Sequence, residues 1–182
     1  MQGSLVDYSS SDEEAKTRVG YWPVHIYLRV ESDSLQKIFA QMKVIQPGLS
    51  SIYPIHISLS KTVELTFDQI TEFTQKFNDL KREFDCVAVS FGRIATYTNE
   101  MRTRHFLSLD VEEGVRELCE LLEKVNSLMN EFRLSLFYDP PSFHCSLAWS
   151  DKQFVKDFSC IQITKGKILL TNLECLLGNK VL

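Results

Sequence analysis

The sequence His-Ile-Ser-Leu at residues 56–59 recurs as His-Cys-Ser-Leu at residues 144–147. Each copy lies in a segment where polar and apolar residues alternate, which predicts a β-strand. Successive side chains on a strand point to opposite faces, so the histidine and the serine of each copy share one face. The pattern therefore predicts two similar strands that each present an imidazole and a hydroxyl together.

Segments of the same kind precede both copies. Before the first copy lie an alternating segment at residues 24–30 and a helix pattern that starts at Ser34 and stops at Pro47-Gly48. Before the second copy lie an alternating segment at residues 106–111 and a helix pattern at residues 112–132. This repeated order predicts an α+β fold of two pseudo-symmetric lobes, in which antiparallel sheets face a central groove and helices cover the outer sides.

Composition predicts one folded unit behind a short tail. Residues 1–18 are acidic, serine-rich and poor in apolar residues, which predicts a disordered segment. Residues 19–182 form the predicted single bilobal domain, and a hydrophobic content of 44% in 182 residues suffices for its core. The five cysteines have no C-x-x-C spacing, so neither a disulfide framework nor a cysteine zinc site is predicted.

Charge and hydropathy restrict the partners. The formal net charge of −4 supplies no overall basic field, so any contact with RNA has to be local. No run of about 18 apolar residues is present, and the N-terminus lacks a signal-peptide pattern. We therefore expect a chain that is neither secreted nor inserted in a membrane. The odd number of cysteines favours a reducing intracellular compartment, and we expect a monomer.

Two imidazoles and two hydroxyls on one groove match the needs of phosphodiester cleavage. One of the histidines, His56 or His144, can take a proton from an attacking hydroxyl while the other gives one to the leaving oxygen. The hydroxyls of Ser58 and Ser146 can donate to the phosphoryl oxygens where charge develops. A ribose 2′-hydroxyl is the natural nucleophile because it already lies beside its phosphate. The two motifs are equivalent in sequence, so they do not show which histidine is the base.

Other uses of histidine and serine are less well supported. The motif histidines have serines rather than carboxylates or cysteines beside them, and no H-x-x-x-H or H-x-E pattern occurs, so no metal or other cofactor is predicted. The G-x-S-x-G pattern of serine hydrolases is absent as well. The other two histidines, His25 and His105, lack the Ser-Leu continuation and are predicted to be structural. A phosphodiesterase acting on 2′,3′-cyclic phosphates and a non-catalytic RNA-binding module remain alternatives.

Five segments carry a resemblance to a known family. They are residues 6–11 (VDYSSS), 56–60 (HISLS), 94–106 (IATYTNEMRTRHF), 137–149 (FYDPPSFHCSLAW) and 178–180 (GNK). Together they are similar to the 2H phosphoesterases, which are defined by two H-x-[ST]-hydrophobic motifs. Within that family, the flanks of the second motif most resemble the branch of U6 small nuclear RNA phosphodiesterases.

The resemblance implies a nuclear enzyme that trims uridines or adenosines from a single-stranded, U-rich RNA 3′ end. The product would be a 2′,3′-cyclic phosphate, which some members open further to a 3′-phosphate. His56 and His144 match the catalytic histidines, and Ser58 and Ser146 match the serines that contact phosphate. The resemblance also implies substrate-binding residues, namely Tyr138, which would stack on a terminal base, and Ser142, Asn99 and Glu100.

Overall fold

The computed structural model describes residues 20–99, 101–163 and 166–182. The predicted tail at residues 1–18 lies outside this part of the chain. In chain order the elements are β1 (Tyr21–Arg29), α1 (Asp33–Ile45), β2 (Ser50–Ser51), β3 (His56–Ser58), β4 (Val63–Thr66), α2 (Phe67–Glu83), β5 (Val87–Thr98), β6 (His105–Glu113), α3 (Val115–Glu131), β7 (His144–Ser150), β8 (Ile168–Leu170), β9 (Asn172–Leu177) and β10 (Lys180–Val181). The predicted α+β class is confirmed.

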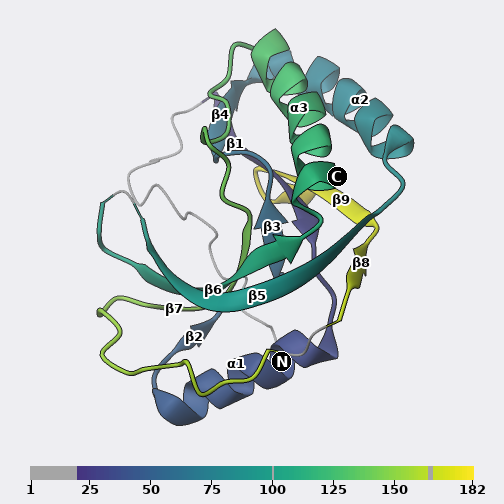
Figure 1. Cartoon of the computed structure of the whole chain (residues 1–182). Helices are drawn as coiled ribbons and strands as arrows, with labels where there is room; N and C mark the ends of the chain where they lie inside the picture. The colour runs from purple at the N-terminus through teal and green to yellow at the C-terminus, as the bar shows by residue number, and fades with distance from the viewer. Residues whose placement is uncertain (1–19, 100, 164–165) are drawn as a thin grey trace, which may run out of the picture.

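The strands form one antiparallel, curled sheet in the order β10-β9-β1-β3-β7-β6-β5-β8, with β2 paired to β7 and β4 paired to β1. Its strong curvature is visible in the long strands β5 and β6 (Figure 1). The two halves that the sequence predicts as facing sheets are therefore continuous, since β3 of the first half pairs directly with β7 of the second. Both motif strands lie next to each other near the middle of this sheet.

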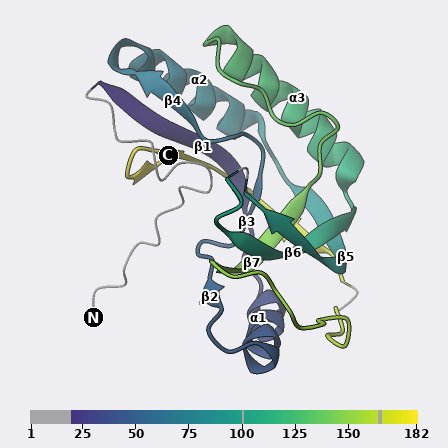
Figure 2. The same ribbon diagram turned by 90° about the vertical axis from the view of Figure 1, so that its left-hand side faces the viewer.

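The predicted internal repeat is present. The order strand, helix, motif strand occurs as β1-α1-β3, with the two-residue strand β2 between α1 and β3, and again as β6-α3-β7. In both views α2 and α3 lie side by side at one end of the molecule, and α1 lies at the other, with β6 and β7 between them (Figures 1 and 2). None of the helices in the described ranges is long and apolar enough to cross a bilayer.

Alternation along β1 explains how the sheet acquires a polar face. Val24, Ile26 and Leu28 are fully buried in the hydrophobic core. His25 and Tyr27 point to the other face, yet they are also buried, at 7% and 4% exposure. Strand β1 lies between β9 and β3, so its polar face is enclosed by neighbouring side chains. A central strand therefore places polar groups in a region that is largely shielded from solvent.

The helix ends follow the local sequence signals. Helix α2 begins at a capping box, where the Thr66 backbone N–H donates to Gln69 Oε1 at 3.0 Å. Helix α1 ends at Ile45, directly before Gln46 and the Pro47-Gly48 pair. The apolar side chains Leu35, Ile38 and Met42 of α1 belong to the same hydrophobic core as the strands. The helices thus fix the motif strands through one shared core.

Candidate active site

The pairing of β3 with β7 brings the two motifs together. Ile57 lies opposite Cys145 in an antiparallel ladder, so the register places His56 across from Ser146 and Ser58 across from His144. The four polar side chains share one face because each is one residue away from the Ile57–Cys145 pair. For ordinary strand spacing, the diagonal between the Cα atoms of the two histidines is roughly 8 Å. A phosphate group fits between side chains held at that separation.

Both motif histidines are held by the same type of hydrogen bond. His56 Nδ1 lies 2.9 Å from the carbonyl oxygen of Pro54, and His144 Nδ1 lies 2.9 Å from the carbonyl oxygen of Ser142. A carbonyl oxygen only accepts, so each Nδ1 carries the proton and donates it. The lone pair of each neutral ring is then on Nε2, which is the atom able to exchange a proton with substrate.

His56 lies in a crowded aromatic environment. Its ring centroid is 5.3 Å from that of His25 and 5.0 Å from that of Tyr27. Burial lowers the pKa of His56 to about 4, the hydrogen bond to the Pro54 carbonyl opposes this shift, and the charge of His144 adds to it. At neutral pH His56 is therefore a neutral base.

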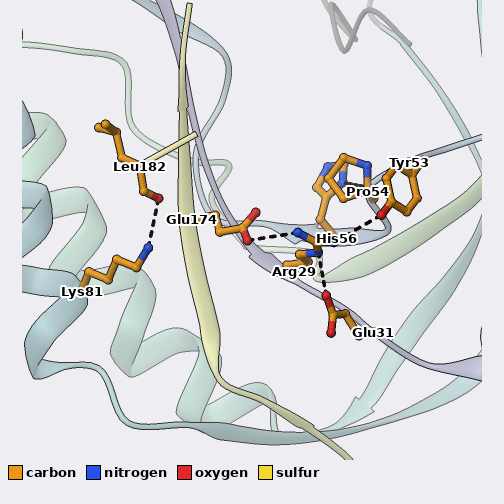
Figure 3. A network of polar contacts seen from close by, with 8 residues as sticks. All are labelled: Arg29, Glu31, Tyr53, Pro54, His56, Lys81, Glu174 and Leu182. Carbon is orange, nitrogen blue, oxygen red and sulfur yellow. Dashed lines mark hydrogen bonds and ion pairs between the residues drawn. The ribbon is translucent and has the colours of Figure 1, made fainter. Parts of the chain in front are cut away.

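An ion-pair network lies beside His56 (Figure 3). Arg29 is the cross-strand partner of His56 on β1. Its guanidinium pairs with Glu31 at 3.0 Å and Glu174 at 3.5 Å, and it donates to Tyr53 Oη at 3.3 Å. The charge opposite His56 is thus a cation that two carboxylates compensate.

His144 has a different environment. Its ring stacks on Tyr97, with centroids 3.9 Å apart and planes 13° from parallel. Its cross-strand partner is Asp110 on β6, which accepts hydrogen bonds from Tyr97 Oη and Arg93 Nε, both at 2.7 Å. Burial lowers the pKa of His144, while the Ser142 carbonyl and the Asp110 carboxylate both oppose that shift. A carboxylate thus supports the charged form of His144.

Each motif serine contacts a polar side chain on the strand that flanks its own, which is β1 beside β3 and β6 beside β7. Ser58 Oγ lies 3.0 Å from His25 Nε2, and Ser146 Oγ lies 2.8 Å from Ser108 Oγ. Ser108 is completely buried. Each serine hydroxyl has one proton to donate, so the direction of its contact decides whether that proton is left for a phosphoryl oxygen.

The remaining predicted residues have various surroundings. Tyr138 is 51% exposed, and Lys61 Nζ lies 4.4 Å from its ring centroid. Ser142 holds His144 through its carbonyl, and its Oγ lies 3.1 Å from Tyr97 Oη.

The side chain of Asn99 organises the turn after β5, because its Oδ1 accepts from the backbone N–H groups of residues 103 and 104. Glu100 lies outside the described residues.

Sequence reasoning missed three residues of this site. His25, Tyr97 and Asp110 all contact a motif side chain or lie opposite one. The available signal was strand alternation, which places His25 with Tyr27 and Arg29 on the polar face of β1. Within the described ranges, no group of three or more histidine, cysteine, aspartate or glutamate side chains is placed to hold a metal ion.

Sequence comparison with known proteins finds relatives that share one name. The family model HVSL, described as an uncharacterised conserved protein, matches residues 12–181. U6 snRNA phosphodiesterase 1 of Mus musculus is 31% identical over 180 residues, which cover 88% of this chain and 67% of the mouse protein. The Homo sapiens protein of the same name is 31% identical over 150 residues, which cover 79% of this chain and 57% of the human one.

Solved structures share the fold. Usb1 of Kluyveromyces marxianus superposes with a TM-score of 0.59 and 17% identity over 90% of this chain and 96% of Usb1. The same protein with uridine monophosphate gives a TM-score of 0.55 at 16% identity, over 90% of this chain and 97% of that one. E. coli LigT in its apo form gives a TM-score of 0.61 at 12% identity, over 86% of each chain.

Proposed function

The chain belongs to the U6 snRNA phosphodiesterase family of 2H phosphoesterases, and we propose that it trims the 3′ end of RNA as a 3′-to-5′ exonuclease. The observation that carries this proposal is the direct pairing of the two motif strands, which puts both histidines and both serines on one face. Membership in this family supports the uridine- and adenosine-rich 3′ end of U6 small nuclear RNA as the substrate and the nucleus as the location. We further propose that the enzyme acts as a monomer on single-stranded RNA.

The proposed reaction is a transesterification. The 2′-oxygen of the penultimate nucleotide attacks its own 3′-phosphorus, and a histidine Nε2 takes the 2′-hydroxyl proton. The bond from phosphorus to the 5′-oxygen of the terminal nucleotide breaks, and the other histidine protonates that oxygen. The products are a shortened RNA with a 2′,3′-cyclic phosphate and a free nucleoside. Water and metal ions are not needed in this step, and we propose that the enzyme uses no cofactor.

The different surroundings of the two histidines support separate roles. Burial among aromatic rings keeps His56 neutral, which suits the general base. Asp110 favours a charged ring at His144, which suits the general acid. We therefore assign proton removal from the 2′-hydroxyl to His56 and protonation of the leaving oxygen to His144.

The other predicted residues would bind substrate around this centre. Ser58 and Ser146 would donate to the non-bridging phosphoryl oxygens. Tyr138 is an exposed aromatic ring on the loop before β7, which suits stacking on the terminal base. Ser142 and Asn99 would bind close to the nucleotide, because their hydrogen bonds hold the backbone around them in place. We extend this proposal to Glu100, which follows Asn99 in the sequence.

The test is cleavage of an oligouridylate in the presence of a chelator. We expect His56→Ala and His144→Ala each to lower the rate by about 10³-fold, because each removes one proton-transfer group. The matched control is His105→Ala, since His105 lies on β6 with its Nδ1 3.1 Å from Thr98 Oγ1 and its ring against that of Phe154. Full activity in either motif variant would overturn the assignment.

Substrate analogues test the chemistry separately. A 2′-deoxy group at the penultimate nucleotide removes the nucleophile, so cleavage of the terminal linkage should stop. Mass spectrometry of the native product should show a cyclic phosphate on the shortened RNA. Activity limited to preformed 2′,3′-cyclic phosphates would instead identify a cyclic phosphodiesterase, and intact RNA recovered from a stable complex would identify a binding module.

A further inference from the structure

His25 is a buried titratable residue to which the proposed reaction gives no role. It lies on β1 at 7% exposure, beside the motif strand β3. Its Nε2 is 3.0 Å from Ser58 Oγ, and its ring meets that of His56 edge to face at 5.3 Å. One histidine therefore contacts both polar members of the first motif.

The direction of the His25–Ser58 hydrogen bond matters for the reaction. Burial lowers the pKa of His25 to about 3, and the charge of His56 contributes, so the ring is neutral under physiological conditions. A neutral imidazole has one donor and one acceptor nitrogen, while a serine hydroxyl has a single proton to donate. If Ser58 donated to His25, its oxygen would present only lone pairs to an anionic phosphate. If His25 donates, the Ser58 proton remains available for a phosphoryl oxygen.

The second motif has a matching contact with different properties. Ser146 is backed by the hydroxyl of Ser108, which is buried and belongs to the adjacent strand β6. That hydroxyl can rotate and can either donate or accept. The imidazole of His25 has no such freedom once its tautomer is set. The contact with His25 thus restricts the direction of the Ser58 hydroxyl proton more than the contact with Ser108 restricts that of Ser146.

We propose that His25 is a positioning residue whose Nε2–H donates to Ser58 Oγ and directs the Ser58 hydroxyl proton toward the scissile phosphate. This inference rests on the proposed phosphodiesterase function, because it specifies how one phosphate-binding group of that site is oriented. The effect of His25 on catalysis passes through Ser58. It follows that His25 loses its importance when Ser58 has no hydroxyl.

A double-mutant cycle tests this dependence. We expect Ser58→Ala to lower kcat by about a hundredfold and His25→Phe to lower it by about tenfold, with KM changed much less. In the Ser58→Ala background, His25→Phe should cause no further loss. His25→Gln, whose amide can donate to Ser58, should recover most of the activity. Equal losses from His25→Phe in both backgrounds, or no loss in either, would overturn the proposal.

Ser60→Ala is the matched control for a merely structural effect. Ser60 Oγ accepts a hydrogen bond from the backbone N–H of Ile26 at 2.8 Å, so its removal also weakens a buried contact with β1. We expect this variant to have a lower melting temperature and an unchanged kcat. A loss of kcat matching that of His25→Phe would assign the effect of His25 to strand packing.

The tautomer of His25 gives a readout that does not depend on activity or on a folded variant. Nitrogen chemical shifts of the imidazole in the wild-type protein show which ring nitrogen carries the proton. We expect a proton on Nε2 and none on Nδ1, and the reverse arrangement would overturn the proposal. If the wild-type protein leaves RNA intact while His25 carries its proton on Nε2, the proposed function has failed and the geometry of the hydrogen bond has not.

Discussion

The two motif strands have equivalent sequences, but their outer neighbours differ. On the β1 side, the residue across from His56 is Arg29, and the aromatic groups His25 and Tyr27 crowd the ring. On the β6 side, the residue across from His144 is Asp110. A pseudo-symmetric pair of imidazoles therefore has surroundings of unequal charge and unequal burial.

This difference shows how a duplicated motif can acquire two chemical roles. An acid and a base are both required in one cleavage step, and two identical environments would favour the same protonation state on both rings. Residues on the neighbouring strands make the two environments different without any change in the motif itself. The acid and base roles that we propose for the two histidines thus depend on residues outside the motifs.

A substrate with a sulfur leaving atom separates the two histidines with the largest effect. Replacing the bridging 5′-oxygen of the scissile linkage by sulfur gives a leaving group that needs no general acid. We expect this substrate to restore most of the loss in His144→Ala, which is about 10³-fold on native RNA, and to leave His56→Ala inactive. Single-turnover rates measure the effect. Rescue of His56→Ala alone would exchange the two roles.

Acid stability provides the second comparison. The folded-state pKa values of His25 and His56 are lowered to about 3 and about 4, so both rings stay neutral in the folded protein while they charge in the unfolded chain below about pH 6.5. Their contribution to stability is therefore complete above that value and is lost as the pH falls. At about pH 5, each ring lowers the free energy of unfolding by about 2 kcal/mol relative to its value at neutral pH.

Urea unfolding at neutral pH and at about pH 5 measures this loss. His25→Phe should reduce the pH dependence by about 2 kcal/mol, because one of the two rings is gone. His144→Phe should reduce it less, because Asp110 supports the charged form of His144. Equal reductions in both variants would show that the two sites are not electrostatically different.

The carboxylate beside His144 should control the alkaline side of the pH–rate profile. Asp110 opposes the lowering of the pKa of His144, so Asp110→Asn should lower that pKa further and move the alkaline limb to lower pH. At neutral pH, the loss in kcat/KM should be about tenfold. Glu174→Gln is the matched control, since Glu174 pairs with Arg29 on the His56 side. It should leave the alkaline limb in place.

Much of the fold was predictable because it follows from local patterns. The stop at Pro47-Gly48, the alternation in β1 and the helix pattern at residues 112–132 all gave elements close to those observed. The continuity of the two halves was not predictable. It depends on the pairing of β7 with β3 and with β2, two strands distant from β7 in the sequence, which no local pattern encodes.

The histidine pair was predictable from its repeated motif, but its supporting residues were not. His25 lacks the motif, and its burial results from the central position of β1 between β9 and β3. Tyr97 lies beyond two register shifts in β5, near Phe91, where simple alternation no longer shows which face a side chain takes. Asp110 acquires its role only from the pairing of β6 with β7.

Lys61 and Tyr138 form a contact between the two halves of the chain, and Lys61 gives the smallest expected effect. Lys61 follows the first motif and lies 4.4 Å above the ring of Tyr138, which precedes the second. Lys61→Met should raise KM for oligouridylate a few-fold at low salt and reduce the slope of log KM against log salt by about 0.7, as for one lost phosphate contact on a single strand.

Tyr138→Leu is the matched comparison for Lys61→Met. It should raise KM by about tenfold through lost stacking and leave the salt slope unchanged, since stacking on a base involves no phosphate charge. If both variants change the slope equally, Lys61 and Tyr138 act as one unit through their cation–π contact. In that case Lys61 orients the ring for the base and does not contact the RNA backbone.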